Sequence, residues 1–133
     1  LEPVFAFADI IGPLSWTTAM CTKDLVDKDL QFVQAFCDAL AEAQQALWVD
    51  RELFVKASVA EFSKVEEPII RAAAENFFGK STAIPRDPTI SKQEWETDMA
   101  FEMAGGSIKS PRPYDEMVDN SFAQKATAKL KKS

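Results

Sequence analysis

The order of hydrophobic and polar positions divides the chain into an extended opening and a longer helical part. The opening, Leu1 to Cys21, is rich in aromatic and β-branched residues and is interrupted by Pro3 and by the Gly12-Pro13 pair. This pattern predicts two short strands around a turn. From Asp29 onward, apolar residues recur at the spacing of an α-helix. We therefore expect one or two short N-terminal strands followed by five to six helices.

The first two helices are predicted from the residues that would begin them. Asp29 is a suitable N-cap, because its carboxylate can accept hydrogen bonds from backbone N–H groups of the first turn. The helix after it runs to about Trp48 and has one apolar face: Val33, Phe36, Cys37, Leu40 and Leu47. Asp50 is expected to cap a second helix, which carries Leu53, Phe54, Ala57 and Phe62.

Prolines and a glycine mark the third helix and the linker that follows it. Pro68 falls in the first turn of this helix, where its missing N–H costs no hydrogen bond, and Gly79 ends it. The apolar residues between them recur at helical spacing. Pro85 and Pro88 then predict an extended linker.

A capping box begins the fourth helix. The Ser91 hydroxyl can accept from the backbone N–H of Glu94 while the Glu94 side chain reaches back, so a helix is expected from here to Gly105. Three apolar residues would face inward from it: Trp95, Met99 and Met103. Pro113 and Asp119 are expected to start the last helical pieces.

The composition is that of an ordinary globular domain. Of 133 residues, 47% are apolar and 27% are charged, which suffices for one core and is unlike a disordered chain. The net charge of −6 argues against nucleic-acid binding, because phosphate contacts require a basic surface. Four lysines near the end suit either the negative end of a helix dipole or a basic recognition tail: Lys125, Lys129, Lys131 and Lys132.

The sequence offers few residues suited to catalysis, redox chemistry or metal binding. Histidine is absent, which excludes His-dependent triads, His-ligated zinc and imidazole proton shuttles. Cys21 and Cys37 fit no redox or metal spacing, so they form one disulfide or are two small buried thiols. Three acidic residues suggest a metal or a carboxylate pair, although neighbouring Pro113 and Asn120 favour helix starts and caps: Asp115, Glu116 and Asp119.

Neither a membrane span nor a signal peptide is visible in the sequence. No apolar run approaches the roughly 18 residues that would suggest a span. The chain begins at Leu1 without an initiator Met, so the lack of a signal peptide says nothing about export.

Four motifs, in this order, resemble the C-terminal region of one protein family. They are Val33-Gln34-Ala35-Phe36, Pro88-Thr89-Ile90-Ser91 ahead of Trp95, Gly105-Gly106 with Ile108 and Lys109, and Pro111-Arg112-Pro113-Tyr114-Asp115-Glu116-Met117-Val118-Asp119-Asn120-Ser121-Phe122. The set is similar to substrate-binding proteins of bacterial ABC importers, in the branch that handles nitrate, aliphatic sulfonates, taurine and thiamine precursors. Leu30 departs from the proline frequent in that family, a change that does not touch ligand chemistry.

This resemblance implies an α/β fold, namely the C-terminal part of a class II periplasmic-binding-protein fold. Residues 1–133 would be a single partial domain of a two-lobed protein, with crossover strands in residues 1–21 and the helical part of the first lobe in residues 22–133. Without the rest of its lobe, the chain would leave an apolar face bare. We therefore expect it to self-associate through Leu1 to Cys21, or to require the missing N-terminal part of the same protein.

The resemblance also implies solute capture without catalysis. A small anionic or aromatic solute of the sulfonate, nitrate or thiamine-precursor class would be enclosed by two lobes and delivered to an ABC permease of the inner membrane. The parent protein would be periplasmic, or extracellular and membrane-anchored. No cofactor, metal, nucleic acid or enzymatic activity is implied. The alternative is a helical interaction or self-associating protein without ligand binding.

One segment is placed at the ligand cleft by the resemblance: Gly12, Ser15, Trp16, Thr17 and Thr18. Its hydroxyl groups would donate hydrogen bonds to ligand oxygens, and the indole of Trp16 would supply an apolar face or an N–H donor. The alternative is that these residues form a buried strand whose side chains alternate in and out of the core.

Overall fold

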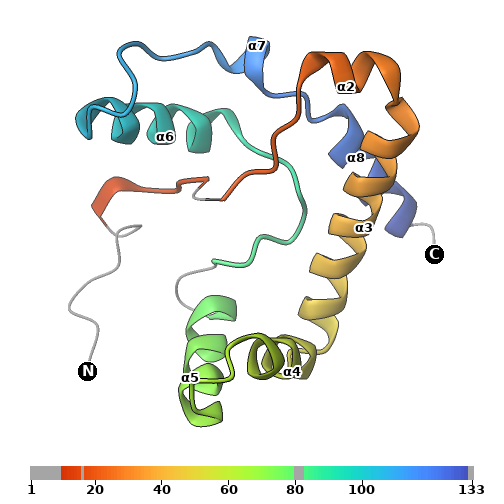
Figure 1. Ribbon diagram of the computed structural model, residues 1–133, viewed down its shortest axis with the longest axis vertical. Coiled ribbons are helices and arrows are strands. Elements are labelled where there is room, and N and C mark those ends of the chain that lie inside the picture. Colours follow the sequence, from red (N-terminus) through yellow and green to blue (C-terminus); the bar gives the residue numbers. More distant parts are fainter. Residues whose placement is uncertain (1–9, 16, 80–82, 132–133) are drawn as a thin grey trace.

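The computed structural model describes residues 10–15, 17–79 and 83–131, and the regular elements within these ranges are all α-helices. In chain order they are α2 (Lys23–Lys28), α3 (Leu30–Val49), α4 (Glu52–Glu61), α5 (Glu67–Phe78), α6 (Lys92–Ala104), α7 (Tyr114–Met117) and α8 (Ser121–Leu130). The long helix α3 connects the two ends of the arrangement. Helix α8 packs beside it, and α4 and α5 pair at its C-terminal end (Figure 1).

The predicted α/β class is wrong. Ile10 and Ile11 are helical, and residues 12–15 and 17–22 form no strand. The rest of the predicted strand segment, residues 1–9 and Trp16, lies outside the described residues. A β-rich composition is only a local preference, and a strand also needs a neighbouring strand to accept its backbone hydrogen bonds. The described part of the chain supplies no such neighbour.

Helix α2 is an element that the hydrophobic pattern did not predict. Its N-cap is Thr22, whose hydroxyl accepts a hydrogen bond from the Leu25 N–H at 3.3 Å. Two ion pairs at i,i+4 spacing, Lys23 with Asp27 and Lys28 with Asp24, each span 2.8 Å. Such exposed pairs add only about 0.3–0.5 kcal/mol each, so this short helix depends on its contact with α3.

Local signals predicted the start of α3 and the ends of α5 well. The Asp29 carboxylate accepts from the Phe32 N–H at 2.9 Å, which confirms the expected N-cap. Pro68 lies in the first turn of α5, and Gly79 ends that helix. At α4 the N-cap is Arg51, one residue later than expected. The Asp50 carboxylate still accepts from the Glu52 N–H at 3.0 Å, so it satisfies a helix-start donor.

Helix α6 begins as predicted but buries less than predicted. The capping box is complete, because Glu94 N–H donates to Ser91 Oγ and Ser91 N–H donates to Glu94 Oε2. The helix contributes no buried residue, and Met103 is 43% exposed, so its predicted inward face is wrong at that position. Gly106, at φ 76°, adopts the left-handed conformation that turns the chain after the helix.

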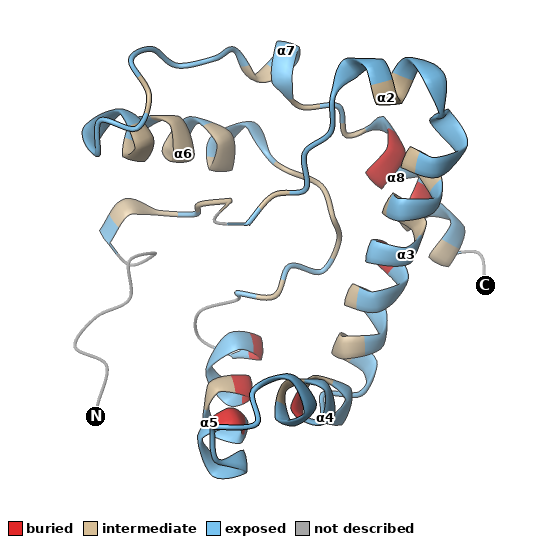
Figure 2. Cartoon of the chain, in the orientation of Figure 1, coloured by how far each residue is buried: buried red, intermediate tan, exposed pale blue. Residues whose placement is uncertain are grey.

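The buried residues form two small groups instead of one core (Figure 2). One group lies on the packed helices α3 and α8: Ala41, Phe122, Ala123 and Ala126. The other joins α4 and α5 through Val55, Ile70, Ala74 and Phe78. Two rings pack edge-on against Phe78, Trp48 at 5.2 Å and Phe54 at 5.6 Å between ring centroids. Neither group contains α6 or α7.

A set of polar contacts holds the linker after α5 against the start of α8. The Asn120 side chain accepts from the Ile90 N–H at 3.0 Å and donates to the Ile90 carbonyl at 2.8 Å. The Tyr114 hydroxyl donates to the same carbonyl at 2.7 Å and accepts from the Asn120 amide at 2.9 Å. We call Ile90, Tyr114 and Asn120 the Asn120 clasp. It joins two of the motifs singled out in the sequence.

Two indole groups extend this attachment of the linker. Trp95 on α6 donates to the Arg112 carbonyl at 2.8 Å, which ties α6 to the segment before α7. Trp48 on α3 donates to the Pro85 carbonyl at 3.2 Å. The extended linker predicted from Pro85 and Pro88 is confirmed, because the described residues 83–91 contain no helix or strand.

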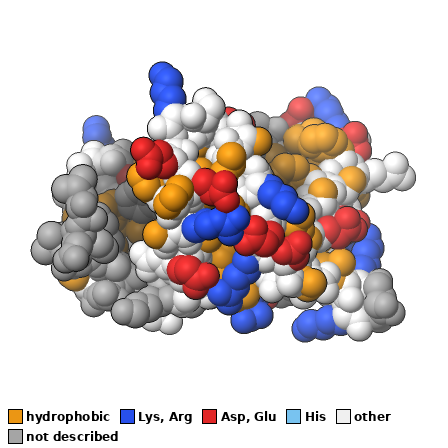
Figure 3. Space-filling view, turned by 90° about the horizontal axis from the view of Figure 1, so that it is seen from below, with side chains coloured by type: hydrophobic (Ala, Val, Ile, Leu, Met, Phe, Trp, Pro, Cys, Tyr) orange, Lys and Arg blue, Asp and Glu red, His pale blue; other side chains and the backbone are white. Residues whose placement is uncertain are grey.

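The surface carries paired charges with apolar residues between them. In the view from below, acidic, basic and hydrophobic side chains are intermixed (Figure 3). Arg71 on α5 joins Glu52 on α4 and Glu67 on its own helix, each at 2.7 Å, and these bonds raise the pKa of the Arg71 guanidinium. None of the described helices has the length and apolar character to cross a membrane.

Replacing Asn120 by alanine should lower stability clearly. The Asn120→Ala variant loses three hydrogen bonds and leaves the Ile90 N–H without its partner, so we expect a loss of about 2 kcal/mol in the free energy of unfolding. The measurement is urea denaturation followed by circular dichroism. Gln93→Ala, on the exposed surface of α6, is the control and should change stability by less than about 0.5 kcal/mol. Equal unfolding midpoints for wild type and Asn120→Ala would contradict the role of the clasp.

Two glycines at helix ends should respond differently to alanine. A Cβ atom at Gly79 would lie 2.5 Å from the Glu75 carbonyl oxygen, so the backbone must shift. We expect Gly79→Ala to destabilise the chain by about 1–3 kcal/mol. At Gly105 the nearest atom would be 3.6 Å away and φ is −75°, so Gly105→Ala should be neutral or slightly stabilising. Thermal unfolding of both variants checks this, and the prediction is wrong if Gly105→Ala is the less stable.

Candidate functional site

The described part of the predicted cleft segment is an irregular turn. Gly12 has φ 86°, a left-handed conformation, and a Cβ atom there would meet nothing within 4 Å. Ser15 is half-buried, Thr17 is exposed, and the half-buried Thr18 donates its hydroxyl hydrogen to the Ser15 carbonyl at 3.4 Å. Trp16 lies outside the described residues. The alternative of a buried strand is wrong for the described positions, because none of them is in a strand.

This turn has the chemical groups that a polar solute requires. An irregular backbone leaves N–H groups available for ligands, and hydroxyls can donate to anionic oxygens. Ser15 and Thr17 are thus suited to a hydrogen-bonding wall, while Thr18 donates its proton locally. A full binding site would require a second wall opposite this one. The cleft role of the segment stays a prediction.

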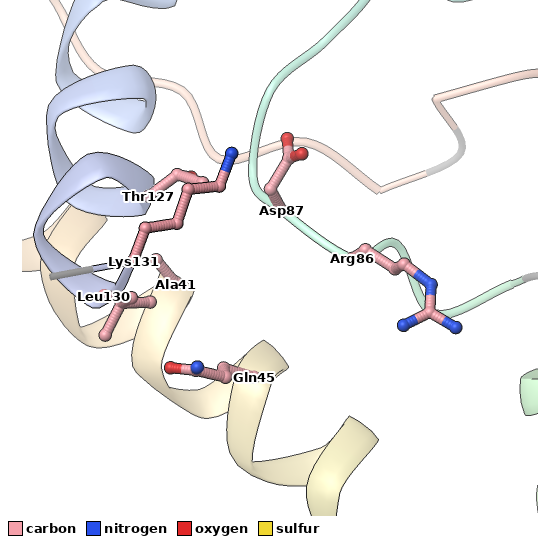
Figure 4. Close-up of a pocket in the computed structure, with 7 residues that line it drawn as sticks. All are labelled: Ala41, Gln45, Arg86, Asp87, Thr127, Leu130 and Lys131. Atoms are coloured by element: carbon pink, nitrogen blue, oxygen red, sulfur yellow. The ribbon is translucent and has the colours of Figure 1, made fainter. Parts of the chain in front are cut away.

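The structure shows a small hollow elsewhere, between α3, α8 and the linker after α5 (Figure 4). It has a volume of about 160 Å³, and its lining residues are Ala41, Gln45, Arg86, Asp87, Thr127, Leu130 and Lys131. The Lys131 side chain extends toward Asp87 (Figure 4). The Arg86 side chain points away from Asp87 and Lys131. A second shallow hollow of about 270 Å³ shares Asp87, Thr127 and Lys131.

The polar groups of this hollow differ in how they are held. Asp87 accepts from the Thr89 N–H at 3.0 Å and from the Thr89 hydroxyl. The Arg86 guanidinium lies 3.9 Å from the centroid of the Trp48 ring, a cation–π contact. The Thr127 hydroxyl oxygen is buried and has no hydrogen-bond partner within the described structure. Lys131 therefore faces the Asp87 carboxylate in this hollow, and the Arg86 guanidinium is engaged with the Trp48 ring.

Sequence reasoning did not find the hollow. Its lining comes from three segments that are distant in the chain, and no motif or periodicity marks Gln45, Arg86 or Thr127. Lys131 was noted only as a candidate dipole partner or recognition residue. At the end of α8, Lys129 lies in the last turn and Lys131 follows the helix. Lys129 also pairs with Asp38 of α3, whereas Lys132 lies outside the described residues.

The acidic residues near the end have structural positions. Asp115 and Glu116 lie in the first turn of α7, and the Asp119 carboxylate accepts from the Ser121 N–H at 2.9 Å at the start of α8. These positions match the predicted helix starts and caps. Among the described residues, no group of three or more Cys, Asp or Glu side chains is arranged to hold a metal ion.

The groups with shifted pKa values lie outside both candidate regions. Burial raises the pKa of the Cys37 thiol, and the Asp38 carboxylate raises it further. Hydrogen bonds from Lys129 and Gln34 lower the pKa of Asp38. Burial raises the pKa of Asp98 on α6. Cys37 and Cys21 are both free thiols, and Cys21 is exposed, so the predicted burial is wrong for Cys21. The shifts at Cys37 and Asp98 follow first from burial, and the shift at Asp38 follows from its contacts with Lys129 and Gln34.

Comparison with known proteins gives one relative. The chain is 25% identical over 128 residues to a protein of Bacillus subtilis (strain 168) named "Putative binding protein YtlA". The alignment covers 94% of the chain and 37% of that protein, so the chain spans little more than a third of the relative's length. No protein-family profile matches the chain. No solved structure matches it either. Part of the expected resemblance is therefore supported, namely a similarity to a protein named for binding.

Proposed function

We propose that the chain is part of a solute-binding protein of an ABC importer and that it binds its ligand without transforming it. The observation that carries this proposal is the alignment, over nearly the whole chain, with a relative named as a binding protein. The positions of the family-like motifs agree with it, because the Asn120 clasp brings two of them together as one structural unit. The parent protein would be periplasmic, or extracellular and membrane-anchored.

The proposed ligand is a small anionic or aromatic solute of the sulfonate, nitrate or thiamine-precursor class. The turn formed by Gly12, Ser15, Thr17 and Thr18, together with Trp16, would supply one wall of the site. Hydroxyl and backbone N–H donors can hold an anion without a buried counter-charge, which permits release after delivery. A second wall would come from the remainder of the protein. An ABC permease of the inner membrane would recognise the closed, loaded form.

A helical interaction protein without ligand binding is the second candidate. The observation in its favour is the amount of apolar side chain at the surface of the described helices, including Phe32, Phe62 and Ile69, each more than half exposed. Such surfaces mark contacts with other macromolecules. The two candidates differ in whether a small solute binds at all.

Isothermal titration calorimetry separates them. The protein is the complete product of the gene that encodes this chain, and the probes are ethanesulfonate, taurine, nitrate and a hydroxymethylpyrimidine. We expect one probe to bind, and the double variant Ser15→Ala, Thr17→Val to weaken that binding at least about tenfold, because each hydrogen bond to a charged ligand contributes about 1.5–3 kcal/mol.

Two variants serve as controls for this experiment. Ser110→Ala removes an exposed hydroxyl from the loop before α7 and should leave affinity unchanged. Lys131→Gln removes a cation from the hollow between α3 and α8 and should do the same. A loss of affinity in Lys131→Gln but not in the double variant would move the site to the hollow. Absence of binding for all four probes would favour the interaction protein.

A further inference from the structure

Residues 91–119 leave the rest of the chain and return to it at one point. The segment starts after Ile90 and ends before Asn120, and it contains α6, the loop after α6, and α7 (Figure 1). The Asn120 side chain bonds both the N–H and the carbonyl of Ile90, at 3.0 and 2.8 Å. We call residues 91–119 the arm. Because the Asn120 clasp joins its two ends, the arm can open while the helices outside it keep their contacts.

Bonds inside the arm tie its parts to one another. The Trp95 indole of α6 donates to the Arg112 carbonyl before α7 at 2.8 Å. The Ser107 N–H donates to the Glu102 carbonyl at 3.0 Å and closes the turn after α6. Helix α6 also packs against α7. These parts therefore gain and lose their structure together.

Apolar packing fastens the arm only weakly to the other helices. None of its residues is buried, and the buried residues of the described structure lie on α3, α4, α5 and α8 (Figure 2). Neither α6 nor α7 packs against one of these helices to the extent that the two pack against each other. Segments with few buried contacts open at a lower free energy than the core of the same protein.

We propose that the arm is a conformational device of this fold, which opens as one unit when the Asn120 clasp breaks, while α3, α4, α5 and α8 stay packed. The clasp includes a contact from inside the arm. The Tyr114 hydroxyl of α7 donates to the Ile90 carbonyl at 2.7 Å and accepts from the Asn120 amide at 2.9 Å. The closed form depends on a few such hydrogen bonds, and their net contribution is modest because the same groups bond to water when the arm is open.

Opening exposes the backbone amides of the arm to solvent. Isolated helices of about 12–15 residues or fewer are marginal in water, so α6 and α7 lose their helical hydrogen bonds when the arm opens. A partner that binds one of the two forms more tightly would shift the balance between them. This inference does not rest on solute binding, because a protein that binds no solute can still open at the clasp. The two proposals are tested by different measurements and fail separately.

Hydrogen exchange followed by mass spectrometry, on the complete product of the gene that encodes this chain, tests the opening. After correction for intrinsic rates, amides of α6 should exchange about tenfold or more faster than those of α3 and α8. Their exchange should also depend less on added urea, because opening the arm exposes less surface than global unfolding. Asn120→Ala should speed exchange in α6 by about tenfold or more. Tyr114→Phe, which keeps the ring and removes one donor, should speed it by about threefold.

Ala126→Gly is the matched control. Ala126 is 1% exposed on α8, which packs against α3, and glycine weakens the interior of a helix. Exchange in α8 and α3 should rise by about twofold to fivefold. Exchange in α6 should stay unchanged, because Ala126 lies outside the arm. Equal urea dependence in α6 and α8, faster exchange of α6 in Ala126→Gly, or unchanged exchange of α6 in both clasp variants would each overturn the proposal.

Discussion

The hydrogen bonds between Asn120 and the backbone of Ile90 are the constraint on which the arrangement of the C-terminal half depends. They close a loop of 30 residues and fix the linker after α5 to the start of α8. Helices α6 and α7 contribute no buried residue, so apolar packing alone does not place them. The Asn120 side chain satisfies both backbone groups of one residue, as a neighbouring strand would, and Tyr114 shares the same carbonyl oxygen. In a chain with so few buried side chains, these directional bonds take over part of the role that a core has in larger domains.

Most helix boundaries could be predicted because their causes are local. Asp29, Ser91 and Gly79 act on backbone groups within the first or last turn, and such groups need no distant partner. The prediction of N-terminal strands was wrong because a strand depends on a distant partner. A strand requires a second strand beside it, and the described residues contain none. Helical periodicity likewise predicted that α3 has an apolar face, but it could not say which residues a neighbour covers. Ala41, which the predicted face does not include, is buried, while Phe36 of that face is half exposed, because α8 packs on one side only.

The two candidate sites also differ in whether the sequence could predict them. The cleft segment Gly12 to Thr18 was inferred from a family resemblance, and the structure adds a left-handed Gly12 and an irregular backbone. The hollow between α3 and α8 had no sequence signal, because Gln45, Arg86 and Thr127 come together only through helix packing and the fixed linker. Its lining combines the Asp87 carboxylate with Lys131 and the buried Thr127 hydroxyl.

The composition of α3 differs from that of a helix with a single partner. A helix with one partner needs one apolar stripe, yet α3 is apolar toward α8 and also along Phe32, Phe36 and Leu40. Of its 20 residues, only Asp38 and Glu42 carry charge. Two apolar sides are explained if the helix lies between two bodies, of which α8 is one. Of the predicted apolar face, Phe36 and Leu40 are 49% and 36% exposed in the described structure. The helix that lines the hollow on one side thus exposes large apolar side chains on another.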